Sequence, residues 1–163
     1  MFLNSRRTFL KKSFLSTAVL VMAGGKLFGA ITPLETLSVV QEDLFPFAKE
    51  LGSNTSAYIS LILNHSRVTD KDKAFIRNGV QWLNEEAILQ YKKLYTQLSS
   101  TNRQNILHTI SNERWGEQWL YTLLTYTMEA MLGDPIYGIN KNESGWKWLN
   151  HTAGIPRPTK ALL

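Results

Sequence analysis

The chain has 163 residues and no cysteine, which excludes disulfides, cysteine-ligated zinc, iron–sulfur clusters, haem attached through C-x-x-C-H and a cysteine nucleophile. Hydrophobic residues make up 44% of it and charged residues 19%, a composition typical of a single folded domain. Five of the 18 basic residues and none of the 13 acidic residues lie in residues 1–30. The remaining 13 basic residues balance the 13 acidic ones, so the net charge of +5 does not predict a nucleic-acid partner.

Residues 1–30 have the order of a secretory signal: a charged start, an apolar run and then small residues. The apolar run, from Phe14 to Ala23, is shorter than the roughly 18 residues expected of a membrane span. The paired arginines followed by Phe-Leu-Lys resemble the twin-arginine (Tat) export signal, which carries folded proteins to the bacterial periplasm. The residues of this motif are Ser5, Arg6, Arg7, Phe9, Leu10 and Lys11. An ordinary basic amphipathic start and an uncleaved N-terminal anchor are the alternatives.

Residues 31–163 are predicted to form one all-α domain, a small bundle of about five helices. The first helix is expected to begin after Thr32, because a threonine N-cap is followed by proline and, three residues on, by Glu35. Pro46 is expected to kink or end it. The second helix is expected to begin near residue 55 or 56 and to end before Arg67.

The third helix is expected to begin at the capping pair Thr69 and Asp72 and to run to about Leu98, with a break near Asn84 as an alternative. The fourth is expected to follow a cap at residue 99 or 100, and the last to span residues 113–132. The last helix carries a stripe of large residues at helical spacing, which predicts core packing: Trp115, Trp119, Leu123, Thr127 and Met131. No segment shows the alternation of a strand.

Residues 133–163 are rich in glycine, proline and asparagine, which predicts a segment without regular helix after a helix C-cap at Gly133. The same segment carries two tryptophans, a tyrosine and several aliphatic residues, too many for a disordered tail. It is therefore expected to be ordered and to pack along the helical body or against a partner.

The usual catalytic patterns are missing from the sequence. There is no P-loop, no dinucleotide-binding glycine turn and no nucleophile elbow. The histidines lack a second ligand one helical turn away, and the neighbouring Glu85 and Glu86 do not face each other on a helix. We therefore predict no catalytic, cofactor-binding or metal-binding residue in this chain, which suggests an accessory subunit.

The tail reads Gly-Asp-Pro-Ile-Tyr-Gly-Ile-Asn at 133–140, Gly-Trp-Lys at 145–147 and Ala-Gly-Ile-Pro at 153–156. These motifs resemble the gluconate 2-dehydrogenase subunit 3 (gamma subunit) family, whose members typically show G-D-P-x-Y-G-G-N, G-W-K and a P-G-like turn. Ile139 stands where the family has a second glycine, so the turn either needs no positive φ at that position or is strained. The resemblance covers nearly all of the exported chain, although only the tail and the twin arginines are specific.

The resemblance implies a non-catalytic partner of a large GMC-type subunit that contains FAD and oxidises a sugar acid or polyol. Electrons then pass to a membrane-bound cytochrome c subunit with haem c, or to another acceptor. No cofactor is implied in this chain. Its Tat signal would carry the folded flavoprotein, which lacks a signal, through the translocase to the periplasm.

An interface with such a partner needs anchor residues, and Trp, Tyr and Arg are enriched at binding hot spots. The candidates in the tail are Tyr137, Trp146, Trp148 and Arg157. Packing of these side chains within the chain is the alternative, and both can hold together. For the whole protein, the alternatives are a stand-alone periplasmic binding or chaperone-like module and a membrane-anchored structural protein with its signal retained.

Overall fold

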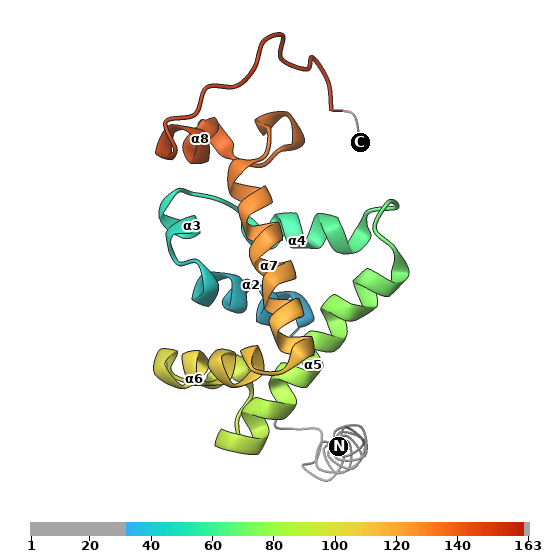
Figure 1. The fold of residues 1–163 in the computed structure, drawn as a ribbon, viewed down its shortest axis with the longest axis vertical. Helices are drawn as coiled ribbons and strands as arrows, with labels where there is room; N and C mark the ends of the chain where they lie inside the picture. Colours follow the sequence, from blue (N-terminus) through green and yellow to red (C-terminus); the bar gives the residue numbers. More distant parts are fainter. Residues whose placement is uncertain (1–31, 162–163) are drawn as a thin grey trace. The chain divides into compact units, whose positions relative to one another are not determined.

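The computed structural model describes residues 32–161, so the predicted export signal lies outside the described residues. Within this part the fold is all-α, as predicted, and contains no strand (Figure 1). Five helices have ten or more residues, in agreement with the expected number: α2 (Pro33–Leu44), α4 (Thr55–Asn64), α5 (Asp70–Tyr91), α6 (Ser100–Ser111) and α7 (Arg114–Leu132). The shorter elements are α3 (Phe47–Glu50), α8 (Ser144–Trp148) and the 3-10 turns η1 (Tyr95–Gln97), η2 (Pro135–Tyr137) and η3 (Lys141–Glu143).

Side-chain caps set the N-terminal ends of four of these helices. Thr32 Oγ1 accepts a hydrogen bond from the Glu35 amide at the start of α2. Equivalent caps at the starts of α4, α5 and α6 come from Asn54, Thr69 and Ser99. A short polar side chain at this position satisfies an amide that has no partner within the helix. The capping signatures of α2 and α5 therefore predicted their first residues correctly, and of the two caps expected for α6 the structure has the one at Ser99.

The C-terminal end of α5 differs from the prediction. The helix passes Asn84 without a break and ends at Tyr91, not near Leu98, because Lys92 adopts the left-handed conformation with φ of 58°. The chain then turns back, and Asn84 Oδ1 accepts a hydrogen bond from the Tyr95 amide at 3.0 Å. In this return segment Leu94, Tyr95 and Leu98 are buried in the core. Their spacing continues the helical pattern of apolar residues, although the backbone does not continue the helix.

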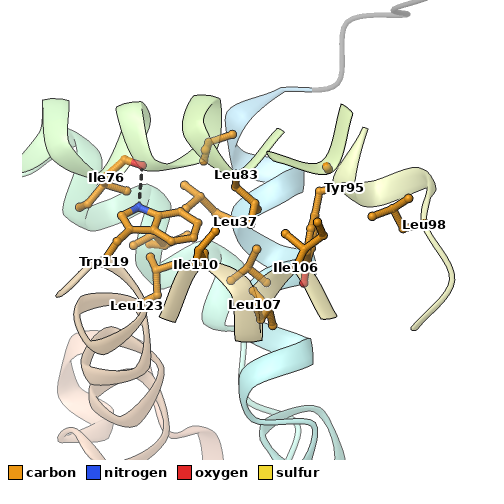
Figure 2. Close-up of a cluster of buried hydrophobic side chains, with 14 residues drawn as sticks. Leu37, Ile76, Leu83, Tyr95, Leu98, Ile106, Leu107, Ile110, Trp119 and Leu123 are labelled. Atoms are coloured by element: carbon orange, nitrogen blue, oxygen red, sulfur yellow. Dashed lines mark hydrogen bonds between the residues drawn. The ribbon is translucent and has the colours of Figure 1, made fainter. Parts of the chain in front are cut away.

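Trp119 of α7 is the largest fully buried side chain, with 0% of its surface exposed. Its Nε1 donates a hydrogen bond to Ile76 O of α5 at 3.0 Å (Figure 2). The indole occupies the space above Gly79, where a Cβ would overlap it. The predicted stripe of α7 is confirmed as core for four of its five members, Trp119, Leu123, Thr127 and Met131, while Trp115 is half-buried.

A polar cluster joins α2, η1 and α6 at the edge of this core. The carboxylate of Asp43 accepts hydrogen bonds from Tyr95 Oη at 2.6 Å and from Arg103 Nε and Nη2 at 2.7 and 2.9 Å. Arg103 Nη1 also donates to Leu98 O at 3.1 Å. Burial, and then the hydrogen bond to Asp43, raise the pKa of Tyr95 well above its usual value. The phenol therefore stays protonated in the folded chain.

This raised pKa predicts a loss of stability in alkali. Unfolded Tyr95 loses its proton near pH 10, whereas the folded phenol keeps it, so the free energy of unfolding should fall as the pH rises above about 10. Tyr95→Phe removes one titrating group and should make that fall shallower. Tyr58 and Tyr126, whose pKa values burial also raises, should account for the part that remains. Urea unfolding between pH 8 and 11 measures both slopes, and equal slopes would show that Tyr95 does not titrate as proposed.

Candidate partner-binding surface

The segment after Gly133 contains more helix than the sequence indicated. It forms η2, η3 and the five-residue α8, although no regular helix was expected there. The cause is a tertiary contact, because Gly145 of α8 lies directly on the backbone of α7 and a Cβ there would overlap Met131 O. A glycine that looks like a helix breaker in the sequence is thus the residue that lets α8 approach α7.

Asn140 connects this segment to the end of α7. It is buried and left-handed, with φ of 47°, and its amide donates to Ala130 O at 3.0 Å. Its Nδ2 donates to Gly133 O at 3.0 Å, and its Oδ1 accepts from the Gly145 amide at 2.8 Å. Asn140 is the last residue of the motif at 133–140, but the sequence was not interpreted as giving it a structural role. An asparagine in a glycine-rich turn is nevertheless a known signal for the left-handed conformation.

The turn before Asn140 settles the question raised by Ile139. Ile139 does not have a positive φ; the left-handed residues on either side of it are Gly138 and Asn140. The first of the two predicted outcomes is therefore correct, and a glycine is not required at this position. The Ile139 side chain instead covers Gly133, where a Cβ would approach its Cδ1 closely.

Trp146 lies inside the packed part of the tail, with 8% of its surface exposed. Its Nε1 donates to Leu132 O at 2.6 Å, and its ring lies 5.6 Å from that of His151. The guanidinium of Arg157 lies 4.9 Å from the Trp146 ring centroid, within cation–π distance. For Trp146 the structure shows the intramolecular packing that the sequence left open as an alternative.

Trp148, two residues later, is 43% exposed. Its ring centroid lies 5.2 Å from that of Phe47, the first residue of α3, and 6.2 Å from that of Phe45, which follows the end of α2. We call Phe45, Phe47 and Trp148 the aromatic patch. Of these three residues, only Trp148 was predicted from the sequence as a binding candidate. The two phenylalanines were missed because they lie about 100 residues earlier in the chain and no local pattern connects them to the tail.

The remaining two candidates lie near the start and the end of the tail. Tyr137 ends η2 and is half-buried, with no recorded aromatic or cation–π contact to the other three candidates among the described residues. Arg157 Nη1 donates to Glu143 Oε1 at 2.6 Å and its Nη2 donates to Asp134 Oδ1 at 3.1 Å. The structure thus brings together Trp146 and Arg157, and places Trp148 in a different group of side chains.

No three histidine, aspartate or glutamate side chains in residues 32–161 are grouped so that they could hold a metal ion. None of the described helices combines the length and the apolar character needed to cross a membrane.

A family of known proteins is similar to this chain over most of its length. The family model described as Gluconate 2-dehydrogenase subunit 3 matches residues 34–154. Neither the curated proteins nor the solved structures contain a significant match. The matched range covers most of the chain and includes α2 from its second residue on, the other four long helices, the aromatic patch and Asn140. This chain therefore belongs to the gluconate 2-dehydrogenase subunit 3 family, whose name implies that it assembles with other subunits of a dehydrogenase.

Proposed function

We propose that this chain is the non-catalytic small subunit of a periplasmic dehydrogenase that oxidises a sugar acid or polyol. Its catalytic partner is a GMC-type flavoprotein with FAD, and a membrane-bound cytochrome c subunit with haem c is a further partner and electron acceptor. The observation that carries this proposal is the family match over residues 34–154.

In this proposal the chain contributes two things to the complex, an export signal and a docking surface for the flavoprotein. Residues 5–11 carry the twin-arginine motif, and Tat export of an already folded complex would take the flavoprotein across the membrane with it. Bound to the small subunit, the flavoprotein would also be stabilised, because a partner that binds only the folded state shifts the unfolding equilibrium.

The aromatic patch supports docking for two physical reasons. Trp148 offers a large exposed apolar surface, and tryptophan is among the residues that contribute most to binding energy. Its contacts with Phe45 and Phe47 hold its ring in one orientation before any partner arrives. Less side-chain entropy is then lost on binding.

The test is a pull-down from the periplasm through a tag placed after residue 163 on a flexible linker, followed by an absorption spectrum. We expect a large subunit with flavin bands to co-elute. Trp148→Ala should reduce the amount of flavoprotein that co-elutes. Loss of a hot-spot residue costs about 2 kcal/mol or more of binding free energy, which is equivalent to roughly 30-fold in affinity. Tyr121→Ala, which removes an exposed aromatic ring from α7, is the matched control.

A single colourless band from the wild-type chain would contradict the proposal. It would favour the stand-alone binding or chaperone-like module. Equal loss of the flavoprotein with Trp148→Ala and Tyr121→Ala would leave the subunit assignment in place and remove the aromatic patch from the interface.

A further inference from the structure

Residues 152–161, which we call the C-terminal arm, are described by the structure but do not pack like the rest of the tail. They form no helix or strand and are exposed along almost their whole length (Figure 1). The last backbone hydrogen bond recorded before the arm runs from the His151 amide to Trp146 O at 2.8 Å, and none is recorded within residues 152–161. Ile155, in the middle of the arm, is 93% exposed.

One side chain ties this arm to the body of the protein. Arg157 is paired with both Glu143 and Asp134, and its guanidinium lies over Trp146. These are the recorded hydrogen bonds and ion pairs between residues 152–161 and the rest of the described chain. A single exposed ion pair would hold the arm weakly, but a planar guanidinium shared by two carboxylates and an indole is a network.

The two carboxylates are themselves held in place. Asp134 Oδ1 also accepts a hydrogen bond from the Ile136 amide and so caps η2. Glu143 lies in a left-handed conformation, with φ of 59°, directly after Asn142, with φ of 57°. Such conformations are costly for residues other than glycine and persist where surrounding contacts impose them. Here Lys147 Nζ donates to Asn142 O at 2.7 Å, a contact that supports the backbone directly before Glu143.

We propose that Arg157 is a latch that holds the C-terminal arm in one conformation, and that the arm ordered in this way docks on the flavoprotein subunit with the exposed Ile155 as its apolar anchor. The docking half of this inference rests on the proposed function, whereas the latch does not. An exposed chain already held in its bound shape loses less entropy when it binds.

The composition of the arm also limits its freedom before binding. Pro156 and Pro158 each have a ring that fixes φ, so the backbone around Ile155 and Arg157 has fewer conformations to lose.

The latch is tested on the isolated full chain by backbone ¹⁵N relaxation. In the wild type, the amides of Ile155 and Thr159 should show the high heteronuclear NOE of an ordered backbone. Arg157→Ala should lower these values to those of a flexible chain, and Lys160→Ala, on the same arm, should leave them unchanged. Arm amides equally mobile in wild type and Arg157→Ala would overturn the latch.

A second readout separates loss of the latch from loss of the fold. The Trp146 indole Nε1–H, bonded to Leu132 O, should remain slow to exchange in Arg157→Ala. Loss of that protection would show instead that Arg157 is needed for the packed part of the tail, and would overturn a latch confined to the arm.

Docking is tested by titrating the purified flavoprotein subunit into the full chain. Ile155→Ser should weaken binding about tenfold while the NOE values stay high, and Arg157→Ala should weaken it similarly while they fall. Unchanged affinity of both variants, with normal binding by the wild type, would overturn docking by the arm and leave the proposed function intact. No binding by the wild type would contradict the proposed function itself.

Discussion

A chain in which Arg6 and Arg7 are both replaced by lysine is expected to remain in the cytoplasm together with its flavoprotein partner. The substitution keeps both positive charges, so an ordinary secretory signal, which needs only a basic start before an apolar run, would still function. A pathway that recognises paired guanidinium groups would not accept lysine, because an ammonium group lacks the planar donor geometry of arginine. Cell fractionation with a dehydrogenase assay measures the result, and nearly all periplasmic activity should be lost.

The matched control replaces Lys12 and Lys26 by arginine, which again conserves charge but lies outside the arginine pair. This variant should be exported normally. Normal periplasmic activity in the double-lysine variant would contradict the escort role. N-terminal sequencing of the exported chain adds a separate result, since a start near Ile31 would eliminate the retained anchor.

Trp119→Ala should produce the largest loss of stability in the bundle, about 3 to 5 kcal/mol of unfolding free energy. The indole is fully buried between α5 and α7, and it fills the space that Gly79 leaves open. Alanine would leave a cavity and remove the hydrogen bond to Ile76 O. Since domains of this size are stable by only about 5 to 15 kcal/mol, much of the chain could unfold at 37 °C. Urea unfolding followed by circular dichroism measures the loss.

Trp148→Ala makes the same chemical change at a partly exposed position and serves as the control. It should lower the free energy of unfolding by less than about 1 kcal/mol, because water already reaches much of the side chain. Similar losses in the two variants would show that Trp119 does not have the structural role assigned to it.

Local chemistry made several features predictable from the sequence. The caps at Thr32, Thr69 and Ser99 involve a side chain and a backbone amide a few residues away, so their spacing along the chain is the relevant geometry. The stripe around Trp119 was predictable because helical spacing puts these residues on one side of α7. The tail motifs indicated the family that the comparison confirms.

Export is predicted from the sequence alone. Residues 5–11 lie outside the residues that the structure describes, so their function as a Tat signal stays a prediction.

Tertiary structure decided the features that depend on contacts between residues far apart in the chain. The apolar residues of the segment 92–98 keep helical spacing, yet the backbone reverses at Lys92 because Tyr95 enters the core beside Asp43 and Arg103. The local pattern cannot distinguish that return from a continued helix.

The two tryptophans of the tail also show the difference between what the sequence predicts and what tertiary contacts decide. Trp146 and Trp148 occupy similar positions in Gly-Trp-Lys-Trp, and sequence analysis treated both as candidates for partner binding. Close packing of Gly145 on α7 directs the indole of Trp146 to Leu132 O, while Trp148 meets Phe45 and Phe47 at the surface. Composition determined that this segment would be ordered and aromatic. Only the position of α7 beneath it decided which ring is buried and which remains exposed to a partner.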